Sequence, residues 1–236
     1  SEFAARYLLA DVTEVAEETR KRHGLLKGAG RLSAEAVAAS ALLSSQIKGE
    51  ERLTVQLQAE DPRLAFLCDI RADGYMRARL QPFNAKRKPG GAIDGIFLVI
   101  KHNAQKELYR GITELSSLPI DKGLQTHLTE SSQVDTVVRI AVQQSSNGEI
   151  RRAVGLLVER LPKAPDLPYL DREAFFSRYS ELHSCKAKEL MKELESGKLL
   201  GSKLHQMEQR DVRWQCRCSK SRITSMLFSL GAKEMQ

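Results

Sequence analysis

The sequence predicts an α+β fold, with an antiparallel-sheet amino-terminal domain packed with helices and a helical linker after it. Three observations predict this fold. Apolar residues first recur at helical spacing and later alternate with polar residues, as they do in strands. Two hairpin signals, Asp73-Gly74 and Asn147-Gly148, separate alternating runs. A proline cluster then marks the end of the strand-rich part, at Pro162, Pro165 and Pro168.

The first fifty residues predict one strand and two helices. The apolar run 6–10 is typical of a short strand. Asp11-Val-Thr-Glu14 has the spacing of a capping box and predicts a helix that ends near His23-Gly24. Ser33 is expected to cap a second helix, which Gly49 would end. The apolar face of that helix is expected at Val37, Ala38, Ala41 and Leu42.

Beyond Gly49 the period of the apolar residues changes to two. Three strands are expected over residues 53–59, 64–70 and 75–80, joined by turns at Asp61-Pro62 and Asp73-Gly74. Such closely spaced strands predict an antiparallel meander. Two further strands are expected over 95–101 and 108–112.

The second half of the chain predicts one more helix, two more strands and a change of character. Pro119 is suited to open a helix whose one face carries Ile120, Leu124 and Leu128. Strands are expected over 136–143 and 150–160. Helices are expected over 172–183, 185–195 and 202–208. We therefore predict three domains: a core at 1–162, a helical linker at 163–210 and the beginning of a redox or zinc module at 211–236.

Composition restricts the class of protein. The chain has 236 residues, of which 42% are hydrophobic, enough for one medium domain with a smaller appendage. No apolar run approaches the ~20 residues that a membrane-spanning helix needs. The net charge of +7 lies mostly in the tail, where residues 186–222 hold ten Lys or Arg and five acids. This excess fits either a solvated helical face or an anionic partner such as RNA.

Motifs of catalysis are absent from the sequence. We find no Gly-rich dinucleotide fingerprint, no Walker-type phosphate loop and no nucleophile elbow, so the sequence predicts no enzyme. The five histidines show no metal-ligand spacing, and we expect them at the surface or at helix ends. The four cysteines do not form a pattern typical of a secreted disulfide scaffold, which favours a reducing compartment. Cys68 is expected to be a small core residue.

Cys216 and Cys218 form the one motif with evident chemistry. Two thiols that are one residue apart can reach the same cation, but a closed structural zinc site needs four ligands. Nearby cations would lower the thiol pKa values and so favour both metal binding and oxidation; these are Arg213, Arg217, Lys220 and Arg222. The simpler alternative is a pair of incidental structural cysteines.

Four segments resemble one known family. They are residues 42–58, which include Lys48-Gly-Glu50 and Thr54-Val-Gln-Leu-Gln58, Ser131-Ser-Gln-Val134, residues 154–162, which end in Leu161-Pro162, and Cys216-Arg-Cys-Ser219. They are similar to the heat shock protein 33 family of redox-regulated chaperones. The resemblance spans nearly the whole chain. It departs from the family pattern at Ser132, Val154 and Ser221.

The resemblance implies a mechanism and its cofactor. The reduced family member holds zinc and is inactive, whereas oxidation forms disulfides, expels zinc and unfolds the linker, so that unfolding proteins are held without ATP. Here the implied metal and redox residues are Cys216 and Cys218. The family's second pair, a Cys-x-x-Cys, is not found in the 18 residues that follow Cys218 (236 − 218 = 18). We therefore expect zinc in the full-length reduced form and no zinc on these 236 residues alone.

The resemblance also implies partners and a location. Unfolded client proteins are the implied ligands, the active form is a homodimer, and an ATP-dependent foldase chaperone acts downstream, all in the cytoplasm and away from membranes. A second hypothesis is a zinc-dependent nucleic-acid-binding protein that uses the basic carboxyl-terminal segment. No aromatic-rich basic platform accompanies that segment, so we do not expect nucleic acid as a partner.

Overall fold

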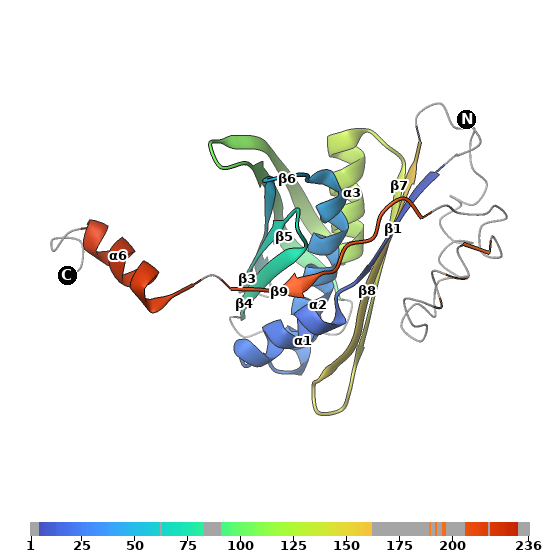
Figure 1. The fold of residues 1–236 in the computed structure, drawn as a ribbon. Coiled ribbons are helices and arrows are strands. Elements are labelled where there is room, and N and C mark those ends of the chain that lie inside the picture. The colour runs from blue at the N-terminus through green and yellow to red at the C-terminus, as the bar shows by residue number, and fades with distance from the viewer. Residues whose placement is uncertain are drawn as a thin grey trace.

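The computed structural model of the chain describes residues 5–61, 63–82, 91–161, 189, 192, 195–196, 206–216 and 218–230. These residues form two β-sheets with helices between and beside them (Figure 1). The fold is therefore α+β, as the sequence predicts.

The smaller sheet joins the start of the chain to residues 136–160. Its strand order is β1-β8-β7, in which β1 spans Ala5–Asp11, β8 spans Ile150–Arg160 and β7 spans Thr136–Gln144. Both pairings are antiparallel, and β8 is the central strand. Most of β8 is buried, because the seven consecutive residues from Ala153 to Glu159 are covered.

The larger sheet has the strand order β6-β5-β2-β3-β4-β9. The strands β2 (Arg52–Asp61), β3 (Arg63–Arg71) and β4 (Tyr75–Pro82) form the expected meander. β5 (Ile93–His102) pairs with the other side of β2, and β6 (Glu107–Leu118) follows β5. The two-residue strand β9 (Arg213–Trp214) joins β4 in parallel.

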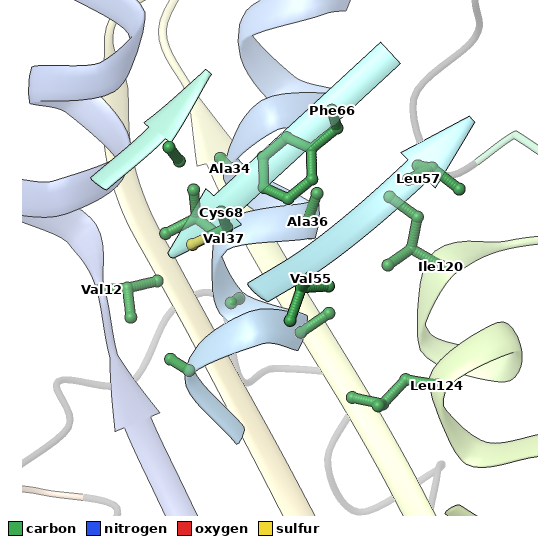
Figure 2. Packing of buried hydrophobic residues seen from close by; sticks show 14 of the residues in the cluster. Val12, Ala34, Ala36, Val37, Val55, Leu57, Phe66, Cys68, Ile120 and Leu124 are labelled. Carbon is green, nitrogen blue, oxygen red and sulfur yellow. The ribbon is translucent and has the colours of Figure 1, made fainter. Parts of the chain in front are cut away.

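The helix α2 (Lys27–Leu42) lies at the centre of the molecule, with one sheet on either side of it (Figure 1). Its many alanines let the backbone approach both sheets closely, and nearly every residue from Ala29 onward is buried. Figure 2 shows Ala34, Ala36 and Val37 of this helix among Val55 and Phe66 of the larger sheet. A short 3-10 helix, η1 (Leu43–Gln46), then leads into β2.

Two further helices cover the sheet ends. α1 (Thr13–Arg22) contacts α2, β8, β4 and β9. α3 (Ile120–Ser132) begins after Pro119 as expected and contacts β5, β6 and β7. The predicted apolar face of α3 is confirmed, because Ile120, Leu124 and Leu128 are all buried. The helix α6 (Lys220–Leu230) lies away from the two sheets (Figure 1).

Four local predictions are wrong. The capping box does not form: Val12 is the N-cap of α1 and makes no side-chain cap, while the Asp11 carboxylate accepts from the Thr13 amide and hydroxyl at 3.1 and 2.6 Å. Ser33 caps nothing, because packing between two sheets extends α2 back to Lys27 and leaves Ser33 buried in its interior. The same helix ends at Leu42, and after the 3-10 turn to Gln46 the chain is no longer helical, so Gly49 does not end it. The histidines are expected at the surface or at helix ends, but His127 is buried. Its Nδ1 lies 3.0 Å from Thr113 Oγ1, which gives the buried ring a polar partner.

The linker prediction is only partly within the described residues. Glu189, Lys192 and Glu195 are helical, in agreement with the expected helix 185–195. Residues 206–208 are not helical, so the expected helix 202–208 does not reach its predicted end. The helix expected over 172–183 and the three prolines lie outside the described residues, and so does the boundary predicted near Lys163.

Candidate redox and metal-binding site

Residues 206–216 form an extended segment, here called the strap, that leads to the cysteine pair. The strap passes the hairpin between β3 and β4 and then runs along β4 (Figure 1). The guanidinium of Arg210 donates to the carbonyl of Ala72 at 3.3 Å. The backbone amides of Arg213 and Gln215 donate to the carbonyls of Gly74 and Met76 at 3.0 and 2.8 Å.

Two side chains of the strap reach the protein core. Val212 and Trp214 are partly buried and pack against the main core cluster. The guanidinium carbon of Arg22, at the end of α1, lies 4.0 Å from the centre of the Trp214 ring, which is a cation–π contact. Arg213, between the two apolar residues, is exposed and pairs with Asp211 at 2.8 Å. The strap thus attaches to the body as an alternating strand.

Gly74 allows the strap to cross the hairpin. Its φ of +85° belongs to the left-handed region that favours glycine, and a Cβ at this position would lie 2.0 Å from the carbonyl oxygen of Asp211. Any side chain would therefore push against the backbone of the strap. The sequence predicts the Asp73-Gly74 turn only as a hairpin signal. In the structure the turn also leaves space for the backbone of the strap, which continues to the cysteines.

Cys216 and Cys218 are both exposed at the end of the strap. The amide of Cys218 donates to Cys216 Sγ at 3.4 Å. This backbone hydrogen bond, together with the Cys218 side chain and the charge of Arg77, lowers the pKa of Cys216. The pKa of Cys218 is raised, because its side chain is hydrogen-bonded to Cys216 and the charge of Cys216 opposes a second negative charge. The pair therefore holds a first thiolate more readily than a second.

Arg77 connects the cysteine pair to the exposed face of the larger sheet. Its Nη1 donates to Cys218 Sγ at 3.7 Å, and its Nε donates to Asp69 Oδ2 at 2.7 Å. Asp69 also accepts from the Thr54 hydroxyl at 2.9 Å, and His102 Nε2 lies 3.3 Å from that hydroxyl. Thr54, Asp69 and Arg77 stand directly opposite one another on β2, β3 and β4. This row fixes the cation beside the sulfurs.

The arrangement can perform thiol chemistry and can supply part of a metal site. A thiolate stabilised by hydrogen bonds and a cation is both a nucleophile toward oxidants and a soft ligand that suits zinc. Within the part of the chain that the structure describes, no group of three or more His, Cys, Asp or Glu residues converges on one point. Two sulfurs fit half of a tetrahedral zinc site, so the other ligands would have to come from elsewhere.

The structure brings together some of the predicted residues and adds one. Cys216 and Cys218 are adjacent, as expected. Arg213 turns to Asp211, whereas Arg217 lies outside the described residues. Arg77 was missed, because an exposed arginine on an alternating strand gives no signal that it faces a residue 141 positions away.

Cys68 differs from this pair in its exposure and in its thiol pKa. It is completely buried in the core between α2 and the larger sheet (Figure 2), as the sequence predicts. Burial raises the pKa of its thiol, which keeps it protonated and unreactive.

The fold and the site together define a class: a two-sheet α+β protein that carries an exposed thiol pair on a strap attached to a sheet edge. The family model described as Hsp33 protein matches residues 2–236. The chain therefore belongs to the Hsp33 protein family.

Curated relatives agree with this placement. The 33 kDa chaperonin of Bacillus subtilis is 26% identical over 243 residues, an alignment that covers 98% of this chain and 83% of the relative. That of Symbiobacterium thermophilum is 27% identical over 241 residues and covers 98% and 82%. The crystal structure of the 33 kDa chaperonin of Thermotoga maritima shares the fold, with a TM-score of 0.74 and 21% identity over 99% of this chain and 83% of that one. Among the described residues, no helix has the length and apolar character to cross a bilayer.

Proposed function

We propose that this protein is a redox-regulated, ATP-independent holdase chaperone, which binds unfolding proteins under oxidative stress and prevents their aggregation. Membership of the Hsp33 protein family supports a chaperone function. The observation that carries the redox part is the exposed Cys216 and Cys218 pair, with its lowered Cys216 pKa, at the end of a strap that covers a sheet edge.

Oxidation of the pair follows from its chemistry. The Cys216 thiolate attacks one oxygen of hydrogen peroxide, the O–O bond breaks, and hydroxide leaves to become water after protonation. The resulting sulfenic acid is attacked by the Cys218 sulfur, which forms the disulfide and releases a second water. Peroxide is reduced by two electrons and the two thiols are oxidised. Oxidation removes the thiolate charge that Arg77 stabilises, which weakens the contact of Arg77 with the cysteine pair at the end of the strap.

Zinc is the proposed cofactor of the reduced form. When bound, a structural zinc contributes folding free energy to a small module, and its ligands must be deprotonated. Cys216 and Cys218 would supply two thiolates, of which Cys216 already has a lowered pKa. We propose that the homodimer is the active form, that an ATP-dependent foldase receives the clients, and that the protein acts in the cytoplasm.

The nucleic-acid hypothesis receives less support. In the strap, Arg210 pairs with Glu208 and Arg213 pairs with Asp211, so these cations are engaged with acids rather than arrayed for phosphates. Phosphate binding weakens steeply with salt, whereas capture of apolar clients does not.

Light scattering from a chemically unfolded client tests the proposal. We expect the chain to suppress aggregation without ATP, and the Cys216→Ser, Cys218→Ser variant to lose the response to peroxide. Cys68→Ala is the matched control, because that thiol is buried, and it should respond like the unaltered chain. If scattering equals that of the client alone, both with and without peroxide, while circular dichroism verifies that the chain is folded, the holdase proposal is contradicted.

A further inference from the structure

We propose that the outer edge of β4 is an acceptor site for an extended apolar segment of an unfolded client, which adds to the larger sheet as a parallel strand. The strap occupies this edge in the present structure and acts as an internal competitor. This inference rests on the proposed chaperone function, which it deepens by naming the surface and the form of the ligand.

The main-chain contacts of the strap show what the edge recognises. β9 pairs with β4 at only two positions, Arg213 opposite Tyr75 and Trp214 opposite Met76. The hydrogen bonds include those from the amides of Arg213 and Gln215 to the carbonyls of Gly74 and Met76, at 3.0 and 2.8 Å. Peptide groups are common to every sequence, so such an edge can bind clients that share no sequence.

The side chains of the strap add a requirement for alternation. Val212 and Trp214 face the core, while Arg213 between them is exposed. Alternate apolar residues are what most half-buried strands of globular proteins contain. An unfolding protein therefore exposes many segments that could replace the strap. Strands that are already paired on both sides in the folded client could not replace the strap.

The strap is weakly held for a strand in this position. The Nε1 group of Trp214 is buried and finds no hydrogen-bond partner among the described residues, which opposes docking. β4 continues for six residues past Met76, to Pro82, whereas β9 ends its pairing there. His23 covers part of this continuation, since its Nε2 lies 3.2 Å from the carbonyl of Ala78. A longer client segment would gain pairs by displacing the His23 ring.

The test measures binding of a labelled peptide with the sequence of residues 209–215 by fluorescence anisotropy. The host is the full chain with Val212→Asp and Trp214→Asp, which remove the apolar anchors of its own strap. We expect this host to bind the peptide about tenfold tighter than the unaltered chain does, because the tethered competitor is weakened. Amide protection on β4, at Met76 and Ala78, should rise when the peptide binds.

Two methylated peptides examine the main-chain contacts directly. Methyl groups on the amide nitrogens of the Arg213 and Gln215 positions remove the two donors to β4 and should weaken binding about tenfold or more. Methyl groups on the Val212 and Trp214 positions are the matched control, since those amides point away from β4 in a parallel ladder, and they should change binding less than about threefold.

Each outcome decides between alternatives. Equal loss with both methylated peptides, or no binding of the unmethylated peptide, would overturn the edge proposal even if the chain suppresses aggregation. Absence of suppression in every form would overturn the chaperone proposal itself. If the double variant does not fold, the unaltered chain treated with peroxide serves as the open host, and the same contrast between methylated peptides is expected.

Discussion

Arg77 joins Cys218 to the body of the protein: its Nη1 donates to the Cys218 sulfur at 3.7 Å while its Nε is held by Asp69 at 2.7 Å. The carboxylate fixes the guanidinium in the row of β2, β3 and β4, so the cation stays beside the thiol pair. A positive charge anchored in a sheet differs from one on a flexible tail, because less conformational entropy is lost to keep it in place. The redox pair is thereby coupled to the sheet whose edge the strap covers.

Replacing Arg77 by Ala should slow the reaction of the pair with iodoacetamide. The charge of Arg77 contributes to the lowered Cys216 pKa, and its loss leaves less thiolate at pH 7. We expect a rate about two- to fivefold lower, since the Cys218 amide still stabilises the thiolate. Arg79→Ala is the matched control, an exposed arginine on the same face of β4. Equal rates for both variants would show that Arg77 does not act on the thiols.

Gly74→Ala should release the strap. The chain has a single tryptophan, Trp214, so intrinsic fluorescence reports directly on docking. Alanine at position 74 would meet the Asp211 carbonyl at 2.0 Å, and the emission should shift toward that of solvent-exposed indole. Gly148→Ala is the control, because Gly148 has a similar φ of +91° and its nearest neighbour is an ordinary 3.5 Å away. Both variants bear a backbone strain of about 1 kcal/mol, but only the first should alter the emission.

The sequence predicts the strands and α3 well, because alternation and helical spacing are local signals. The start of α2 is not predictable in this way: burial between two sheets extends the helix to Lys27 without any capping residue, and the polar Ser33 is carried into its interior. The candidate site also contains residues that local signals predict and residues that they do not. Cys216 and Cys218 are recognised from their spacing, whereas Arg77 and the two-residue β9 depend on a pairing between distant parts of the chain.

Thiol reactivity should separate the core cysteine from the exposed pair. The fourth cysteine, Cys185, lies outside the described residues, so the experiment uses a Cys185→Ser background. In it, Cys216 and Cys218 should react rapidly with a disulfide reagent such as dithionitrobenzoate, because both are exposed. Cys68 should react only after unfolding, since burial raises its pKa and blocks access. The count of fast thiols should be two, and should rise to three in denaturant. A third fast thiol in the native protein would contradict the placement of Cys68 in the core.

His127 should make stability depend on pH in the acid range. Burial lowers the pKa of His127 to about 4, whereas an unfolded histidine titrates near 6.5. Below pH 6.5 the unfolded chain binds a proton that the folded chain rejects, so the stability present above pH 6.5 is lost progressively as the pH falls toward 4. The loss from this group is at most about 3.5 kcal/mol, because each pH unit between the two pKa values contributes about 1.4 kcal/mol.

Urea unfolding at pH 7, 5.5 and 4.5 measures this dependence. His127→Gln removes the titrating ring but keeps a polar group for Thr113, whose hydroxyl lies 3.0 Å from Nδ1 in the present structure. Because glutamine does not titrate, we expect the variant to lose less stability than the unaltered chain between pH 7 and pH 4.5, even if it is less stable at pH 7. His102→Gln is the control, since that ring is only partly buried on β5. An unaltered pH dependence in His127→Gln would assign the acid sensitivity to other groups.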